Sequence, residues 1–378
     1  MNSGWKEKGM IKVLHVFNVM DRGGAEAMIM NLYRNINRKN VQFGFIVHQE
    51  REGEYDREII ELGGEIFRVP QFCGYNMKAY KKAFQCIFME HSEYAIVHGH
   101  MQSTAAIYLK EAKKLGRITI AHSHNTSSGR GFKAMLKTIL QYPIRFRTDY
   151  MFACSKAAGK WLYGKNKMSQ NSVKVIYNAI DIDRYRFDAE VRNKIRKQQG
   201  LDDKIVIGHV GRFTYQKNHE FLIKVFQIFQ EKHGSAILLL IGNGESEEKI
   251  RNLVKYSGLE NSVKFLGVQD NVHEWIQAMD LFLFPSRYEG LPVTLIEAQT
   301  CGVPCVISDN ITDEAILYKV AKVSLKSDVN EWVHVMEESL KINVSRSEGE
   351  AVIKNTNYNI KNAAAQIENA YCNMIIKK

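Results

Sequence analysis

The sequence has 378 residues, of which 45% are hydrophobic and 25% charged, and its formal net charge is +11. This length exceeds one ordinary hydrophobic core and predicts two domains of roughly 180 residues each. Six cysteines without a C-x-x-C pair are typical of reduced thiols in a cytoplasmic protein and exclude a disulfide framework. No apolar run approaches the ~20 residues of a membrane span, and no signal-peptide core precedes Lys12.

The first half of the chain alternates apolar strand patterns with helical patterns, which predicts a parallel sheet covered by helices. The first predicted strand leads into Gly23-Gly24-Ala25-Glu26, and a predicted helix then runs over 26–34. This order of strand, glycine turn and helix suits close approach of backbone to a ligand. The predicted strands of this half are 12–17, 42–47, 65–69, 95–97, 117–121 and 150–153.

Two His-x-His pairs follow neighbouring predicted strands. His98 and His100 close the strand at 95–97, and His122 and His124 close the strand that ends at 121. Because ligands of parallel sheets bind beyond the carboxyl ends of the strands, we interpret His100 and His124 as ligand contacts. Two alternatives stay open: a zinc site built from the four histidines, and buried structural histidines at positions 98 and 122.

Basic residues are concentrated in the first half, where residues 1–178 hold 27 Lys and Arg against 14 Asp and Glu. Within it, segment 129–147 combines an apolar stripe with positive charges. This pattern is typical of an interfacial helix or a groove for an anionic lipid-linked acceptor, and equally of an ordinary surface helix. Nucleic acid is not an expected partner, because no nucleic-acid module is present. The stripe comprises Phe132, Met135, Leu136, Ile139 and Leu140, and the charges are Arg130, Lys133, Lys137, Arg145 and Arg147.

A linker is predicted at 178–183. It contains Asp181-Ile182-Asp183, a D-x-D pattern that binds manganese in some other proteins. Its position at the junction favours a helix cap over a metal site. The second half then repeats the first, with predicted helices at 219–232 and 293–300 and strands at 205–208, 236–241, 263–265, 281–284 and 304–307.

Two glycine-rich segments follow strands of the second half. The first contains Arg212 and Lys217, which can neutralise a diphosphate, the guanidinium as a bidentate fork and the ammonium as a point charge. The second, Gly242-Asn243-Gly244, lacks the third glycine of the dinucleotide fingerprint. An NAD-dependent enzyme is therefore not expected.

The most informative segment lies at 289–297, after the apolar strand 281–284. Glu289 precedes Gly290 and Leu291, Pro292 is expected at the first helical position, and Glu297 lies about one turn inside the helix. Free backbone N–H groups at this helix start can hold a diphosphate, and the Glu297 carboxylate can accept hydrogen bonds from a ribose. Taken alone, such a pair of glutamates is more often a helix cap with solvated charge.

Together these motifs resemble glycosyltransferase family 4, whose members are retaining enzymes of the GT-B fold. The resemblance covers nearly the whole chain. The amino-acid sequences of segments 211–223 and 289–309 look most like those of the family branch that makes bacterial exopolysaccharides and capsules. The matching motifs are GGAE at 23–26, AHSHN at 121–125, NAID at 178–181, GRFTYQKN at 211–218, GNGE at 242–245 and the pair Glu289 and Glu297.

The resemblance implies two Rossmann-like domains, at 1–178 for the acceptor and 179–358 for the donor, facing a cleft, with a C-terminal helix at 359–378 that returns to the first domain. It implies no metal or other cofactor. The implied catalytic residues are Glu289, His124, Arg212 and Lys217. The implied donor-binding residues are Gly23, Gly24, Arg212, Lys217, Gly242, Gly290, Leu291 and Glu297, and the implied acceptor-side residues are Glu26 and His100.

The expected reaction is transfer of a sugar from a nucleotide diphosphate sugar, with uridine as the first choice of base, to a glycan or polyprenyl-linked saccharide. The expected location is the cytoplasm, with a possible peripheral site on the inner face of the membrane. Two alternatives stay open. One is an epimerase or hydrolase that acts on the sugar nucleotide without an acceptor, and the other is a noncatalytic protein that binds nucleotide sugars.

Overall fold

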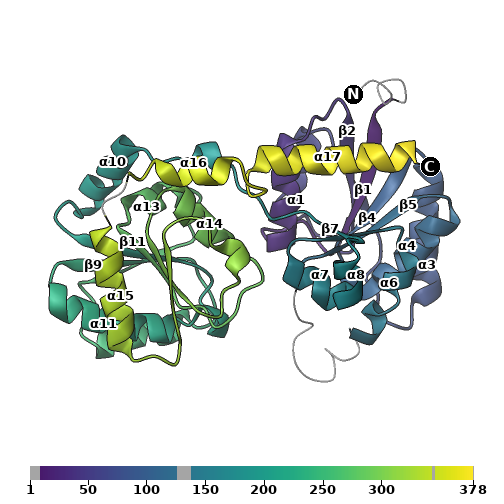
Figure 1. Cartoon of the computed structure of the whole chain (residues 1–378). Helices are drawn as coiled ribbons and strands as arrows, with labels where there is room; N and C mark the ends of the chain where they lie inside the picture. The colour runs from purple at the N-terminus through teal and green to yellow at the C-terminus, as the bar shows by residue number, and fades with distance from the viewer. Residues whose placement is uncertain (1–8, 126–137, 343–344, 378) are drawn as a thin grey trace. The chain divides into compact units, whose positions relative to one another are not determined.

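The computed structural model describes residues 9–125, 138–342 and 345–377. The chain divides into two compact units (Figure 1). One unit comprises Met1–Ala179 together with Ile360–Lys378, and the other comprises Ile180–Asn359. Each unit is a parallel sheet with helices on both faces, so the α/β class and the two Rossmann-like domains predicted from the sequence are confirmed.

The first unit has a seven-stranded sheet in the order β3-β2-β1-β4-β5-β6-β7, and each neighbouring pair is parallel. The strand order reverses between β1 and β4, which is where ligands bind in doubly wound sheets. The strands are β1 (Ile11–Phe17), β2 (Val41–Val47), β3 (Glu65–Arg68), β4 (Tyr94–Gly99), β5 (Ile118–Ser123), β6 (Tyr150–Ala153) and β7 (Val173–Val175). The helices are α1 (Gly24–Asn35), α2 (Asp56–Glu61), α3 (Met77–Glu90), α4 (Gln102–Lys114), α6 (Ile144–Arg147), α7 (Lys156–Tyr163), α8 (Lys165–Ser169) and α17 (Ile360–Ile376).

The second unit has a six-stranded parallel sheet in the order β10-β9-β8-β11-β12-β13, which reverses between β8 and β11. Its strands are β8 (Ile205–Val210), β9 (Ala236–Ile241), β10 (Val263–Gly267), β11 (Leu281–Phe284), β12 (Cys305–Ser308) and β13 (Val320–Val323). Its helices are α9 (Ile182–Tyr185), α10 (Ala189–Gln199), η1 (Tyr215–Lys217), α11 (His219–His233), α12 (Glu247–Tyr256), α13 (Val272–Ala278), α14 (Val293–Thr300), η2 (Asp313–Ala315), α15 (Val329–Lys341) and α16 (Glu348–Lys354).

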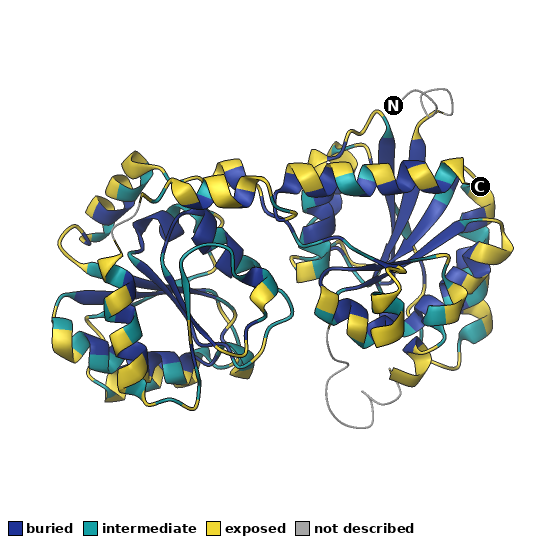
Figure 2. Ribbon diagram, viewed as in Figure 1, coloured by how far each residue is buried: buried dark blue, intermediate teal, exposed yellow. Residues whose placement is uncertain are grey.

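The central strands of both sheets are buried on two faces (Figure 2), whereas the edge strands β3, β10 and β13 are only partly buried. The sequence of β9, AILLLI, is apolar throughout and every residue of it is buried. A continuous apolar run of this kind is expected where helices cover both faces of a parallel sheet. The core of each unit therefore consists of its strands and the inner faces of its helices.

Helix α17 completes the first unit. Its buried residues recur three, four and seven positions apart, so one apolar stripe faces the unit while the other side is exposed. Ile367 and Tyr371 are fully buried in the core of that unit, and the Tyr371 hydroxyl lies 2.8 Å from His98 Nδ1. The C-terminal helix thus supplies a polar group beneath the ends of β4 and β5.

The predicted linker contains a helix cap, as expected. The Asp181 side chain accepts a hydrogen bond of 3.2 Å from the Asp183 backbone N–H at the start of α9. The expected place of Pro292 is wrong by one residue: it is the N-cap of α14, and Val293 is the first helical residue. Its backbone is extended, with φ −78° and ψ 90°.

Part of the predicted basic segment, including Arg130, Phe132, Lys133, Met135, Leu136 and Lys137, lies outside the described residues. In the described portion, Ile139 and Phe146 are 59% and 69% exposed. None of the helices in the described ranges is long and apolar enough to cross a membrane.

Candidate active site

In the second unit, candidate residues gather where the strand order reverses. Arg212 and Lys217 follow β8, and Glu289 lies in the loop between β11 and α14. Two contacts join these loops: the Arg287 N–H donates to the Gln216 carbonyl at 2.8 Å, and the Asn218 side chain donates to the Pro285 carbonyl at 3.1 Å. The parallel sheet thus brings together residues that are 67 and 71 positions apart in the sequence.

Lys217 and Glu289 form an ion pair, with Nζ 2.8 Å from Oε1. Only 15% of the lysine side chain and 7% of the glutamate side chain are exposed. The Gln216 amide donates to the other oxygen of Glu289 at 3.0 Å, and the Lys217 ammonium lies 4.5 Å from the centre of the Phe284 ring. Lys217 and Glu289 were both predicted from the sequence as site residues, but the ion pair between them was not. Gln216 was not predicted.

Arg212 differs from Lys217 because it is exposed, and its side chain has no ion pair or hydrogen bond with any residue that the structure describes. Its guanidinium is therefore available to an anion without first giving up a carboxylate. An exposed arginine fork and a largely buried lysine match two different ways of contacting phosphate oxygens.

Glu297 lies in the second turn of α14 and is half-buried. The Tyr185 hydroxyl donates to its Oε1 at 2.7 Å, and burial raises the pKa of Glu297 while this hydrogen bond opposes the rise. The other carboxylate oxygen has no partner among the described residues and can accept hydrogen bonds from a ligand. Tyr185 belongs to none of the motifs, so its contact with Glu297 could not be predicted from the sequence.

Glycine is required by loop packing at position 242 but not at position 290. A Cβ at Gly242, whose φ is +132°, would lie 2.3 Å from the Gly211 carbonyl oxygen, so this glycine lets two loops pack together. A Cβ at Gly290 would meet nothing within 4 Å, and the backbone N–H groups of Gly290 and Leu291 have no hydrogen-bond partner in the described part of the chain. Nothing in the unit itself requires a glycine at position 290.

In the first unit, Gly23 caps α1 and the Glu26 carboxylate folds back over it. A Cβ at Gly23 would lie 2.2 Å from Glu26 Oε2, whereas one at Gly24 would meet nothing within 4 Å. Burial raises the pKa of Glu26. A negative charge at the N-terminus of a helix is favourable. The Glu26 carboxylate therefore lies next to the Gly23 backbone, where phosphate oxygens of the donor were expected.

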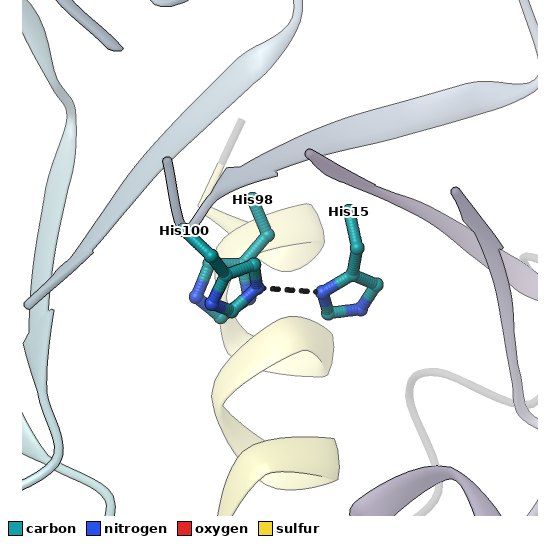
Figure 3. Close-up of side chains that lie close together, drawn as sticks. All are labelled: His15, His98 and His100. Carbon is teal, nitrogen blue, oxygen red and sulfur yellow. Dashed lines mark hydrogen bonds between the residues drawn. The ribbon is translucent and has the colours of Figure 1, made fainter. Parts of the chain in front are cut away.

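Five histidines lie together at the reversal of the first sheet. His15 of β1 was missed by sequence reasoning, although a lone histidine inside an apolar strand is a signal in principle. His15 Nδ1 lies 2.9 Å from His100 Nε2, and His100 Nδ1 lies 2.8 Å from His124 Nε2 (Figure 3 shows the first contact). His98 Nε2 lies 3.2 Å from His122 Nδ1. The predicted residues 98, 100, 122 and 124 therefore form one cluster.

Burial keeps this cluster neutral. The pKa values of His15 and His124 are lowered to about 3, and those of the other three histidines are also well below the ordinary value, in each case mainly through loss of solvation. At neutral pH each imidazole thus has one N–H and one lone pair. His15 and His122 are fully buried, and the Nε2 atom of each has no partner among the described residues.

Comparison with known proteins identifies the chain. Residues 22–184 match the model of Glycosyltransferase Family 4, and residues 191–331 match that of Glycosyl transferases group 1. The putative glycosyltransferase EpsF of Bacillus subtilis is 34% identical over 343 residues, which cover 89% of this chain and 88% of EpsF. The chain belongs to glycosyltransferase family 4. This family 4 glycosyltransferase is therefore an enzyme.

Other relatives support the branch and the fold. The capsular polysaccharide biosynthesis glycosyltransferase CapH of Staphylococcus aureus is 27% identical to this glycosyltransferase, over 81% of the chain and 83% of CapH. Anabaena HepE, solved with UDP, is 18% identical and superposes with a TM-score of 0.77 over 95% of this chain and 99% of HepE. A glycosyltransferase from Rickettsia africae gives a TM-score of 0.80 at 14% identity, with 98% and 100% coverage. The structural likeness concerns the fold.

Proposed function

We propose that this glycosyltransferase moves a sugar from a UDP-sugar to a hydroxyl of a glycan or polyprenyl-linked saccharide, with retention of configuration, in exopolysaccharide or capsule synthesis. The observation that carries the proposal is the convergence of Arg212, Lys217, Glu289 and Glu297 at the strand reversal of the second sheet. The UDP bound by HepE and the capsule synthesis named for CapH support the donor and the pathway.

Each residue of the second unit has a proposed role. Glu297, oriented by Tyr185, accepts hydrogen bonds from the ribose hydroxyls. Arg212 and Lys217, with the free N–H groups of Gly290 and Leu291, hold the diphosphate, while Gly242 shapes the adjacent loop. Glu289 keeps Lys217 in position and contacts the transferred sugar.

Charge stabilisation on the leaving diphosphate is the main chemical requirement of the proposed reaction. The C–O bond of the donor breaks as the acceptor oxygen attacks the same face of the sugar, and the leaving phosphate oxygen takes the acceptor proton. In the first unit, Gly23 and Gly24 are assigned to the diphosphate, His124 to the sugar, and Glu26 and His100 to the acceptor. Transfer is proposed to need no metal, so treatment with a chelator should leave turnover intact.

The donor site is tested by thermal shift with UDP, GDP, ADP and CMP. A ligand at about 100 times its Kd stabilises the native state by roughly 2.7 kcal/mol. We expect a shift with UDP that is lost in Glu297→Ala, reduced in Tyr185→Phe and retained in the control Glu331→Ala, an exposed carboxylate of α15. A UDP shift that persists in Glu297→Ala would contradict the ribose assignment.

Transfer itself is tested by product analysis. Conversion of UDP-sugar with no acceptor present would favour the epimerase or hydrolase alternative. Binding of UDP without turnover on any lipid-linked or free glycan would favour the noncatalytic alternative. Sugar transfer that depends on an acceptor, with the donor configuration kept in the product, is the expected result.

A matched pair of glycine substitutions separates ligand approach from loop packing. Gly290→Ala should leave Tm unchanged or slightly raised, because the new methyl group meets open space, and should weaken UDP binding. Gly242→Ala should destabilise the protein by about 2–4 kcal/mol, because the methyl group meets a backbone oxygen at an unfavourable φ. Calorimetry and UDP titration measure both. Normal UDP binding by Gly290→Ala would oppose contact between this loop and the donor.

We propose further that the first unit binds an anionic membrane surface through exposed side chains near α6. Ile139, Leu140, Tyr142 and Phe146 are 59%, 43%, 56% and 69% exposed. Arg145 lies 4.9 Å from the Tyr142 ring centre and donates to a backbone carbonyl, so a carboxylate does not neutralise it in the described contacts. Apolar side chains next to positive charge are typical of interfacial binding.

Sedimentation with phosphatidylglycerol-containing vesicles tests the membrane proposal. Burying one phenylalanine contributes about 1.5–3 kcal/mol, so Phe146→Ser should lower partitioning about tenfold or more. Tyr75→Ser, which removes a side chain that is 91% exposed elsewhere in the unit, is the control. Binding that is equal for both variants, or absent in the unaltered protein, would contradict the proposal.

A further inference from the structure

The histidine cluster of the first unit offers a set of metal ligands that the transfer reaction does not require. One ring nitrogen from each of His100, His122 and His124 lies within 4.8 Å of the other two, and His15, His98 and His100 form a second such set. Figure 3 shows the second set, with His15 reaching from β1 towards the residues at the end of β4. Three imidazoles at this spacing need only small side-chain rotations to reach the nitrogen separation of about 3.3 Å in a tetrahedral zinc site.

The two sets share His100 but differ in access. His15, His98 and His100 are all buried, whereas His124 is partly exposed and provides a route for an ion to reach His100 and His122. His122 and His124 project from the end of β5, and His100 follows the adjacent strand β4. The set at 100, 122 and 124 is therefore the one that an ion can enter from solvent.

The surrounding hydrogen bonds can fix the tautomers that a metal needs. His122 Nδ1 contacts His98 Nε2, and His98 Nδ1 contacts the Tyr371 hydroxyl at 2.8 Å. His100 Nε2 contacts His15 Nδ1. If His122 Nδ1 and His100 Nε2 carry the protons, His122 Nε2 and His100 Nδ1 present lone pairs to the ion, which then replaces the 2.8 Å contact between His100 Nδ1 and His124 Nε2. A hydrogen-bonded second shell of this kind is usual for metal-bound histidines.

An unpartnered buried nitrogen in the cluster also favours a bound metal ion. His122 Nε2 is buried and unpartnered within the described ranges, and an unsatisfied buried group costs about 1–3 kcal/mol. A coordinated ion would satisfy it, and the remaining tetrahedral position would hold water. Carboxylates are absent from the two sets found in the described residues, which favours a borderline ion over calcium or magnesium.

We propose that His100, His122 and His124 bind one divalent transition-metal ion of the zinc class. The ion is a ligand of the first unit rather than a cofactor of transfer. The ion coordinates the imidazole of His124. If His124 contacts the transferred sugar, as proposed above, bound zinc blocks this contact and inhibits transfer. That consequence alone rests on the proposed function, whereas binding of the ion does not.

Direct titration of the full, untagged chain with Zn²⁺ after treatment with a chelator tests the site by isothermal calorimetry. We expect one equivalent to bind, with affinity reduced about 100-fold or more in His124→Gln and His122→Gln. His334→Gln, which alters an exposed histidine of the second unit, should bind normally. His124 is partly exposed, so its variant should fold even if a substitution at buried His122 does not.

Co²⁺ provides a second readout, because visible absorption of the bound ion reports tetrahedral coordination independently of activity. Strong visible bands in the unaltered protein that are lost in His124→Gln would support the site. Absence of Zn²⁺ binding, or binding that both cluster variants retain, would overturn it. Since UDP binding is measured separately, failure of the metal site would leave the donor-site proposal intact.

Discussion

Arg212→Ala is expected to lower kcat by about 10²–10³-fold while leaving Tm unchanged. The guanidinium is exposed and has no partner among the described residues, so its removal costs the fold little. In the proposed transition state it faces the charge that develops on the leaving diphosphate, where a fixed donor has its largest effect. Release of UDP in the presence of lipid-linked acceptors, together with calorimetry, measures both quantities.

The control for Arg212→Ala is Arg251→Ala, which removes an arginine from an exposed ion pair on α12 of the same unit. This variant should keep nearly full turnover, because an exposed pair four residues apart on a helix contributes only about 0.3–0.5 kcal/mol. A near-normal rate for Arg212→Ala, or a lost rate that follows a lowered Tm, would contradict the role assigned to Arg212.

Lys217→Ala should reduce both turnover and stability. It leaves the Glu289 carboxylate, whose side chain is only 7% exposed, without its cation. Breaking a buried pair in this way costs about 3 kcal/mol, and we expect Tm to fall by roughly 6–12 °C. The buried ion pair thus distinguishes Lys217 from Arg212, whose removal should leave Tm unchanged.

A double substitution separates the two effects. Lys217→Met with Glu289→Gln leaves no buried unpaired charge, so it should recover much of the stability that Lys217→Ala loses. Turnover should stay low, because neither the cation for the diphosphate nor the carboxylate is restored. If Lys217→Ala keeps the Tm of the unaltered protein, the pair contributes little to the fold. If the double variant regains turnover, the proposed phosphate contact is wrong.

The sequence predicted element bounds best where most residues of the element are buried. Strand 236–241, strand 281–284 and helix 293–300 have the bounds expected from their apolar patterns. Strands β7 and β13, which have three and four residues at sheet edges, were missed, whereas the edge strands β3 and β10 were predicted with bounds that differ by one or two residues. An edge strand pairs on one side only, so pairing with a longer neighbour sets its extent more than its own composition does.

In the candidate site, too, some features were predictable from the sequence and others were not. By itself the sequence determined the fold class, the family resemblance, and the charged and glycine residues that follow the strands, because each of these depends on residue type and local order. Only the tertiary structure decided that Lys217 pairs with Glu289, that Tyr185 contacts Glu297, and that His15 joins the histidines of β4 and β5. These partners are 72, 112 and 85 residues apart, and the strand order that brings them together is a property of the packed sheet that no local pattern encodes.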